Sequence, residues 1–322
     1  MLARLPSGPP GRRPMTESMD RDPPRIFLAG ATGFIGGHIL RGLLRAGHAV
    51  TCLIWPGQAL TPTLTQRERR ALPLPLGEGL RMIEGQWTRP AEWVEAVAGH
   101  AAVVNAVGVI REGPGSTFAA VQTEAPGALF RAAARAGARQ LVQISALGAD
   151  AGVRTPFLLT KRAADELALG LGVPAVVLRP SVVYGPGDHS MAFFRRLAAL
   201  PVTPVPGDGR YRLQPVHVDD LVRAVVLACA RPGRHGAFDL GGGTVLTFNA
   251  LLHALARHRG RRRARLLHVP WPLMRLVARL TDLAGRGPIT TDELTMLRRG
   301  SVADNGPFVA TFGFAPRPFR PG

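Results

Sequence analysis

Between residues 25 and 230, short apolar runs alternate with segments whose apolar positions recur at helical spacing. The apolar runs are 25–30, 48–55, 79–85, 101–108, 139–148 and 174–185. The predicted helices are 38–47, 91–98, 117–136, 160–170 and 219–230. Continuous aliphatic and β-branched strands, buried on both faces and alternating with helices, are typical of parallel sheets. The pattern predicts an α/β fold, with a doubly wound parallel (Rossmann) sheet and a smaller C-terminal substrate lobe.

This regular alternation breaks after about residue 183 into loops rich in proline and glycine. The predicted division is a tail at 1–24, a sheet domain at 25–182 to which 215–232 returns, and a C-terminal lobe at 183–214 and 233–322. The first 24 residues are rich in proline, arginine and glycine and lack the apolar centre of a signal peptide, so we expect a flexible tail. No run of 18 apolar residues occurs, so we expect no membrane-spanning segment.

A glycine-rich turn follows the first predicted strand and opens the first predicted helix. Glycines in such a turn allow positive φ and let the backbone approach a pyrophosphate, whose negative charge then lies at the helix N-terminus. The sheet domain is therefore predicted to bind a nicotinamide dinucleotide, NAD(P). The predicted contact residues in the turn are Gly30, Thr32, Gly33, Phe34, Ile35 and Gly36.

The end of the second predicted strand bears on the choice between NAD and NADP. A NAD enzyme usually places Asp or Glu there to bind the ribose diol, whereas this chain has Ile54 and then Trp55. Without a carboxylate nothing repels a 2′-phosphate, so NADP(H) is favoured over NAD(H). The arginine that usually accompanies NADP is missing at Trp55, although Arg67, Arg69 or Arg70 could fold back to supply it.

Small and polar residues end the later strands of the predicted sheet. Ala106 and Gly108 leave room for the cofactor, and Asn105 is expected to pin its strand to a neighbour. Ser145 ends the next strand, where it either faces the nicotinamide as a catalytic residue or caps the strand.

Lys161 is the single lysine among 40 lysine and arginine residues. A chain that uses arginine wherever positive charge alone is needed keeps lysine where a guanidinium cannot serve, because the ammonium is compact and rotatable. We predict that Lys161 contacts the cofactor; the alternative is a lysine that survives at an exposed site by chance. Pro180 and Ser181 complete the predicted cofactor site.

Other acid–base candidates have weaker support from the sequence. Tyr184 is expected at the floor of the cleft, with Asp188 and His189 on the loop that follows it. His217 and Asp219 are expected to form a turn and a helix N-cap. The nine histidines show no metal-ligand spacing, and no serine lies in a GxSxG turn, so neither a metal site nor Ser–His–Asp catalysis is predicted.

The net charge of +18 is compatible with nucleic-acid binding, but the arginines are spread over every predicted helix and no reader motif occurs. We therefore predict no nucleic-acid partner. The basic run 257–265 is explained by a solvated surface or by contact with anionic lipid or a partner. A predicted helix at 271–283 carries Trp271 at one end and two arginines four residues apart, and it either packs on the sheet domain or lies in a membrane interface.

Cys52 and Cys229 both lie in apolar runs, which predicts buried thiols in a reducing compartment. The expected location is cytoplasmic, with peripheral association at the inner face of a membrane as an alternative.

Seven segments together resemble the NAD(P)-binding epimerase/dehydratase superfamily, which comprises the extended and atypical short-chain dehydrogenases. They are GATGFIGGHIL, VVNAVG, QISALGAD, FLLTKRAADE, VLRPSVVYGPGD, LQPVHVDDL and FDLGGGTVLTF. The resemblance covers residues 25–320. Within the superfamily, VPWPLMRLVARL and GPITTDELTMLRRGSVADNGPF make the chain most similar to bacterial relatives of the nucleotide-binding accessory subunit of respiratory complex I.

The resemblance implies roles for individual residues. Lys161 would hold the nicotinamide ribose and tune a tyrosine four residues earlier, but that position is Phe157. Ser145 would be the first member of a serine pair whose second, catalytic member is here Ala146. Gln86 would stand in for the aspartate that recognises the adenine amino group; the alternative is a polar residue with a structural role only. Some relatives continue into a DoxX-like membrane segment, which implies a membrane-protein partner.

The sequence thus leaves three functions open. The first is an NAD(P)-binding oxidoreductase of the short-chain-dehydrogenase type with impaired acid–base machinery. The second is a non-catalytic NADPH-binding subunit or redox sensor of a membrane respiratory or quinone system. The third is a sugar-nucleotide epimerase or dehydratase. The small-molecule substrate is not indicated by the sequence.

Overall fold

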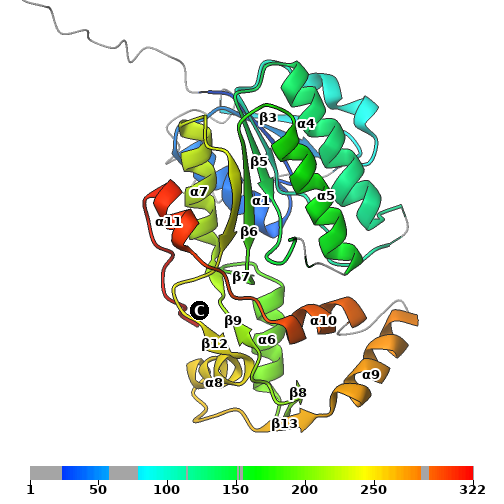
Figure 1. Ribbon diagram of the computed structural model, residues 1–322, viewed down its shortest axis with the longest axis vertical. Coiled ribbons are helices and arrows are strands. Elements are labelled where there is room, and N and C mark those ends of the chain that lie inside the picture. The colour runs from blue at the N-terminus through cyan, green and yellow to red at the C-terminus, as the bar shows by residue number, and fades with distance from the viewer. Residues whose placement is uncertain are drawn as a thin grey trace, which may run out of the picture.

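The computed structural model describes residues 24–57, 79–113, 115–150, 152, 155–283 and 290–321. The expected flexible tail, except for residue 24, and Arg67, Arg69 and Arg70 lie outside these residues. The described part forms a sheet domain and a smaller lobe beside the carboxyl ends of its strands (Figure 1).

A seven-stranded parallel sheet forms the centre of the larger domain, in the order β11-β6-β5-β4-β1-β2-β3. Its strands are β1 (Ile26–Ala29), β2 (Val50–Ile54), β3 (Leu80–Glu84), β4 (Ala102–Asn105), β5 (Gln140–Ile144), β6 (Ala175–Pro180) and β11 (Gly236–Leu240). The order of the strands reverses between β1 and β4, and ligands of such sheets bind outside the carboxyl ends at this point. The predicted α/β, doubly wound fold is confirmed.

Helices cover both faces of the sheet (Figure 1). One face carries α1 (Phe34–Arg45), α7 (Val218–Ala230) and α11 (Gly306–Phe312). The other carries α4 (Ala125–Arg135), extended at its start by a π-helical turn (Ala120–Glu124), α5 (Pro156–Gly170) and the short 3-10 helices Pro90–Glu92 and Val94–Val97. Both faces must be apolar, and β1 shows this directly: Ile26 and Leu28 pack on the first side, Phe27 and Ala29 on the second.

The lobe is built from short strand pairs and helices. Its strands are β7 (Val183–Tyr184), β8 (Thr203–Pro206), β9 (Arg212–Leu213), β10 (Val216–His217), β12 (Leu246–Thr247) and β13 (Leu266–Val269). They form three two-stranded sheets, β10-β7, β12-β9 and β13-β8. Its helices are α6 (Ser190–Ala199), α8 (Phe248–His258), α9 (Trp271–Leu283) and α10 (Thr291–Arg299).

The sheet domain takes more of the late chain than the predicted division gave it. Strand β11, which the prediction placed in the lobe at 233–322, pairs in parallel with β6 and forms one edge of the central sheet. Helix α11 covers this edge, because Phe308 and Phe312 join the core and Phe312 meets Phe238 of β11 edge to face at 5.4 Å. Within the predicted return of 215–232, helix α7 packs on the sheet, whereas β10 pairs with β7.

Candidate functional site

The glycine-rich turn joins β1 to α1 at the point where the strand order reverses. Gly30 has φ of +92°, and a Cβ there would lie 2.7 Å from the carbonyl carbon of Ala106 on β4's loop. A Cβ on Gly36 would collide with the carbonyl oxygen of Gly30. Gly33 has φ of −81°, so the expected positive φ occurs at Gly30 and not at Gly33. Two of the three glycines are therefore required by close backbone packing.

The start of α1 is suited to an anion. Gly33 is the N-cap and supplies no side-chain hydrogen bond, and the first turn contains no acidic residue. The first N–H groups of the helix therefore stay available, and the helix dipole favours negative charge there. A Cβ on Gly33 would meet only the carbonyl oxygen of Gly30, at 3.4 Å, so the outer side of the turn is open. Thr32 is exposed and Phe34 and Ile35 are partly buried beside it. The turn fits a pyrophosphate.

The carboxyl ends of β2 and β3 border the same region. Ile54 is buried and Trp55 is half exposed, and residues 54–57 contain no carboxylate. The turn after β3 is fixed by Gln86, whose N–H donates to Glu92 across 2.7 Å and whose carbonyl accepts the indole N–H of Trp93. The backbone of Gln86 is thus held firmly at the sheet edge.

Lys161 lies on α5 with its ammonium directed at the carboxyl ends of β4 and β5. Its Nζ donates to the carbonyl of Val107 at 3.3 Å and to that of Ile144 at 3.2 Å. A Cβ on Gly108 would lie 2.9 Å from this Nζ, so the missing side chain of Gly108 leaves room for it. Burial lowers the pKa of Lys161 to about 8, although the nearby Asp165 carboxylate raises it. The lone lysine is therefore buried at the predicted site and is not an exposed survivor.

Ser145 belongs to a buried polar network that the sequence did not reveal. Its Oγ donates to Oδ2 of Asp165 at 2.9 Å, and the same oxygen accepts a hydrogen bond from Nε of Arg179 at 2.9 Å. Oδ1 of Asp165 is buried without a hydrogen-bond partner. Burial raises the pKa of Asp165 to about 6, while the Arg179 and Lys161 charges and the Ser145 hydrogen bond oppose the rise. Ser145 is nearly fully buried and lies close to the predicted cofactor site.

Phe157 lies one helical turn before Lys161 and faces an apolar cluster. Its ring meets Phe118 edge to face with centroids 5.8 Å apart, and the cluster also contains Ala149 and Leu158. Residues spaced by four share a helix face, so Phe157, Lys161 and Asp165 point in the same direction from α5. One face of α5 thus presents a phenyl ring, an ammonium and a carboxyl group in turn.

Several predicted residues are engaged in structural contacts. Asn105 confirms its expected role, because its Nδ2 donates to Oε1 of Gln143 on β5 at 2.8 Å. Ala106 donates its N–H to Ala29. Pro180 is buried, and the hydroxyl of Ser181 bonds to Oγ of Ser301 at 2.8 Å, which ties the end of β6 to the segment after α10.

The weaker acid–base candidates also have structural partners. The Tyr184 hydroxyl accepts the N–H of Arg320 at 3.2 Å within the lobe. Asp188 is buried, caps the backbone of Ala192 and pairs with Arg195 at 3.0 Å. His217 is the N-cap of α7 and accepts the N–H of Asp219, so the expected N-cap is present, with His217 as the capping residue. His189 precedes α6 at its N-cap. No group of three or more potential metal ligands occurs among the described residues.

A cavity of about 490 Å³ opens between the sheet domain and the lobe. Its lining residues are Leu147, Gly148, Asp150, Arg210, Tyr211, Arg212, Asp239, Arg298, Arg299, Gly300, Ser301 and Val302. Arg299 is engaged with Asp150 at 2.7 Å and with the carbonyl of Gly148. The lining therefore has an excess of arginine over carboxylate.

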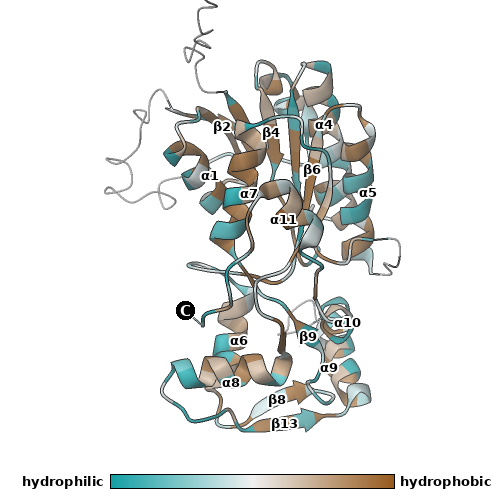
Figure 2. Cartoon of the chain, turned by 60° about the vertical axis from the view of Figure 1, so that its left-hand side comes forward, coloured by the Kyte–Doolittle hydropathy of each residue, from teal (hydrophilic) through white to brown (hydrophobic). Residues whose placement is uncertain are grey.

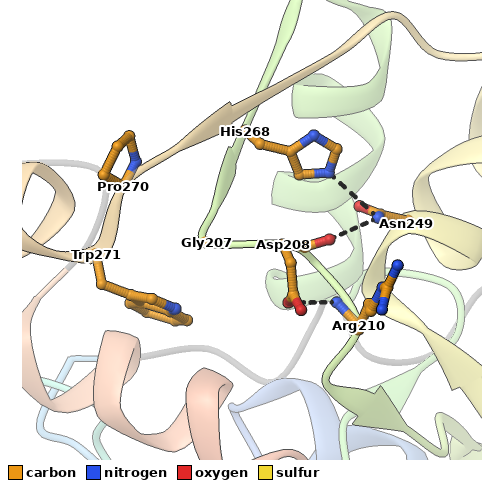
Figure 3. Close-up of a pocket in the computed structure, with 7 residues that line it drawn as sticks. All are labelled: Gly207, Asp208, Arg210, Asn249, His268, Pro270 and Trp271. Carbon is orange, nitrogen blue, oxygen red and sulfur yellow. Dashed lines mark hydrogen bonds between the residues drawn. The ribbon is translucent and has the colours of Figure 1, made fainter.

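A second cavity, of about 480 Å³, lies within the lobe and is shown in Figure 3. Asn249 lies on one wall, where its Nδ2 donates to the carbonyl of Asp208 at 2.8 Å and lies 3.3 Å from Nε2 of His268. Arg210 lines both cavities, and Trp271 at the start of α9 forms the opposite wall (Figure 3).

Comparison with known proteins identifies the family of this chain. The model of the NAD dependent epimerase/dehydratase family matches residues 26–241, which include the glycine turn, Ser145 and Lys161. The chain belongs to the NAD-dependent epimerase/dehydratase family. The predicted resemblance is thereby confirmed, and the chain is of the short-chain-dehydrogenase-like oxidoreductase type.

Individual relatives are distant. Ceramide reductase of Caulobacter vibrioides is 26% identical over 208 residues, covering 64% of this chain and 61% of that protein. Subunit 9 of the NADH dehydrogenase [ubiquinone] 1 alpha subcomplex of Arabidopsis thaliana is 26% identical over 263 residues, covering 79% of this chain and 62% of that one. The chain thus spans about three fifths of the length of these relatives. MoeE5, solved with UDP-glucose and NAD, shares the fold with a TM-score of 0.65 and 24% identity, covering 92% of this chain and 94% of MoeE5.

Proposed function

We propose that the chain is an NAD(P)-binding oxidoreductase that favours NADP(H) and has impaired acid–base machinery, because Phe157 stands at the position of the family's tyrosine. The observation that carries the proposal is the pairing on α5 of a buried Lys161 with a phenyl ring one turn earlier. Lysine would hold the nicotinamide ribose, but a phenyl ring has no proton to donate or accept.

The chain's own residues divide into binding and proton-handling groups. The turn at Gly30, Gly33 and Gly36 would hold the pyrophosphate, and Lys161 the ribose hydroxyls. The nicotinamide, when bound, supplies or accepts a hydride. Ser145 directly follows Ile144, whose carbonyl accepts a hydrogen bond from Lys161, and the Ser145 hydroxyl proton is already donated to Asp165. Ser145 is therefore set to accept a hydrogen bond from a substrate, and any proton it releases would pass to the carboxyl of Asp165.

The preference for NADP(H) rests on the end of β2. Ile54 and Trp55 offer no carboxylate to repel a 2′-phosphate, and the half-exposed indole of Trp55 offers an apolar surface beside the site. Calorimetric titration with NADPH and NADH tests this preference. We expect tighter binding of NADPH; equal or tighter binding of NADH would contradict it.

The substrate is proposed to carry negative charge. Arg210, Arg212 and Arg298 line the cavity between the domains, and their guanidinium groups suit carboxylate or phosphate oxygens.

Buried free thiols at Cys52 and Cys229, whose pKa values burial raises, support the proposed cytoplasmic location.

A non-catalytic NADPH-binding subunit or redox sensor of a membrane respiratory or quinone system is the second candidate. Two observations favour it. Phe157, at the position of the missing tyrosine, packs against the ring of Phe118, and the chain is similar to a complex I subunit. A sugar-nucleotide epimerase or dehydratase would be affected most by the missing phenol.

One pair of proteins separates these functions. The wild type and Phe157→Tyr are compared for NADPH oxidation with a panel of carbonyl compounds, including acidic ones, after equal NADPH binding has been shown by calorimetry. Slow turnover in the wild type that rises in Phe157→Tyr supports an impaired oxidoreductase. NADPH binding without turnover in either protein supports the binding subunit, and absence of NADPH binding contradicts both.

A further inference from the structure

Helix α9 carries a stripe of apolar side chains on its outer face. Leu273, Leu276, Val277 and Leu280 are between 38% and 58% exposed. Their spacing of i, i+3, i+4 and i+7 places them within an arc of about 100° on one side of the helix. None of the described residues buries this stripe.

The opposite face of α9 holds the helix on the lobe. Ala278 is fully buried, and Trp271 and Met274 are partly buried on the same side. A Cβ on Gly207 would collide with the indole of Trp271, and the guanidinium of Arg298 lies 5.3 Å from the ring centroid. Trp271 therefore anchors α9 to the lobe and α10. The outer leucines are not needed for that attachment.

Positive charge surrounds the stripe. Residues 257–283 contain eight arginines and a single acidic residue, Asp282. On α9, Arg279 lies beside the stripe and Arg275 lies farther round the helix, and Arg262, Arg263 and Arg265 are exposed in the loop before β13. That loop is fastened by Arg261, which donates to the carbonyl of Leu200 at 2.8 Å at the end of α6.

Strand β13 adds a further exposed apolar side chain. It leads directly into α9 through Pro270, and its Leu267 is 55% exposed. In Figure 2, β13 lies at the end of the lobe remote from the sheet, and α9 rises from that end along one side of the lobe. An apolar strip with arginines along its border is typical of segments that lie in the headgroup region of a membrane.

We propose that α9 and the basic run 257–265 bind the surface of a bilayer that contains anionic lipids. The leucine stripe enters the boundary between headgroups and acyl chains, and the arginines contact the phosphates. The helix lies along the surface, and no described helix has the length and apolar character required to cross the bilayer. The charge decides for lipid over a second copy of the chain, because two surfaces with this excess of arginine repel each other.

The test is flotation of the full chain with vesicles of phosphatidylcholine alone and of an equimolar mixture with phosphatidylglycerol. We expect binding to the mixed vesicles at low salt and little binding to the neutral ones. Salt that shortens the Debye length to about 3 Å should release most of the bound protein. Absence of binding to mixed vesicles at low salt would overturn the proposal.

Two double variants separate the apolar and the charged contributions. Arg262→Gln with Arg263→Gln should weaken partitioning about twenty- to thirtyfold, at about fivefold per arginine near an anionic surface. Leu276→Gln with Leu280→Gln should weaken it by at least about tenfold. The matched control, Met82→Gln, alters a side chain that is 52% exposed on β3 of the sheet domain and should change nothing.

Two results would count against a lipid surface. Unchanged binding of the leucine variant would show that charge alone adsorbs the protein. A wild-type dimer in light scattering that the leucine variant converts to monomer would show that a second copy covers the stripe. Circular dichroism of each variant confirms that the exposed substitutions leave the fold intact.

Discussion

The hydroxyl of Ser145 donates a hydrogen bond to the carboxylate of Asp165 across 2.9 Å, inside a network closed on the other side by Arg179. Asp165 lies one helical turn beyond Lys161 on α5, so the carboxyl group interacts both with the predicted catalytic hydroxyl and with the buried ammonium. The protonation state of Asp165 therefore affects both the hydrogen bond of Ser145 and the pKa of Lys161.

Stability should fall as pH rises through the range in which Asp165 ionises. Burial raises its pKa from 3.8 to about 6, so between these values the folded protein holds a proton that the unfolded chain has lost, and stability declines with rising pH. The decline amounts to at most about 3 kcal/mol. Urea unfolding of the wild type and Asp165→Asn at several pH values measures it. The difference in unfolding free energy between the two proteins should change between pH 3.8 and about 6. A constant difference would show that Asp165 does not ionise in this range.

Binding of NADPH should weaken as pH rises above about 8. Lys161 loses its proton near this value because burial lowers its pKa from 10.5, and the charged ammonium makes the stronger hydrogen bonds. Asp165→Asn should move the midpoint to lower pH, since the carboxylate raises the pKa of Lys161. Calorimetric titration with NADPH at several pH values measures the pH midpoint of the loss of binding. Equal midpoints in the wild type and Asp165→Asn would show that Asp165 does not influence the cofactor site.

Lys161→Arg should weaken dinucleotide binding by tenfold or more, although the charge is kept. The ammonium fits between the carbonyls of Val107 and Ile144 below Gly108, and a planar guanidinium is too broad for this space. Loss of each charge-assisted hydrogen bond costs about 1.5–3 kcal/mol. Fluorescence titration with NADPH measures the change, and wild-type affinity in the variant would place the ribose elsewhere.

Gly33→Val should abolish dinucleotide binding and leave the chain folded. A side chain at Gly33 meets only the Gly30 carbonyl oxygen within the protein and projects toward the anion site at the start of α1. Gly36→Ala is the informative contrast, because its Cβ collides with the same oxygen and should disturb the turn itself. Circular dichroism and calorimetry distinguish the two. Intact binding in Gly33→Val would mean that the pyrophosphate binds at another place.

Arg317→Ala should destabilise the protein by about 1–2 kcal/mol. Arg317 pairs through Nε with the buried carboxylate of Asp220 at 2.9 Å, and its own side chain is 47% exposed, so solvent reduces the loss from that of a buried pair. Arg89→Ala removes an exposed pair with Glu92 and should change stability by less than about 0.5 kcal/mol. Urea unfolding compares the two, and equal effects would show that the burial of Asp220 does not matter.

The sheet was predictable because its inner strands are buried on both faces and therefore consist of continuous apolar residues. Strand β11 escaped the prediction because it contains Asp239, buries only two of its five residues and lies among glycines. The two-residue strands of the lobe are too short to show a period of two. Helix α11 has only seven residues, too few to show a helical period. The role of its apolar side chains follows only from their contact with β11.

The cofactor turn and Lys161 were predictable because their residue types and spacing are tied to the chemistry of phosphate and ribose binding. Asp165 was not, since an acidic residue within ADELA has the appearance of a solvated helix face. Its burial depends on the position of α5 against β5 and β6, which no local pattern encodes.

The position of β11 late in the sequence has a consequence for folding during translation. Strand β6 acquires its outer neighbour only after residues 181–235 have been synthesised. At roughly 5–20 residues per second, the apolar edge of β6 stays unpaired for about 3–11 s. Unpaired strand edges attract other chains, so the nascent chain is exposed to aggregation at this edge during the interval. A nascent chain stalled between β6 and β11 would hold every residue of the glycine turn and Lys161 and still present an open sheet.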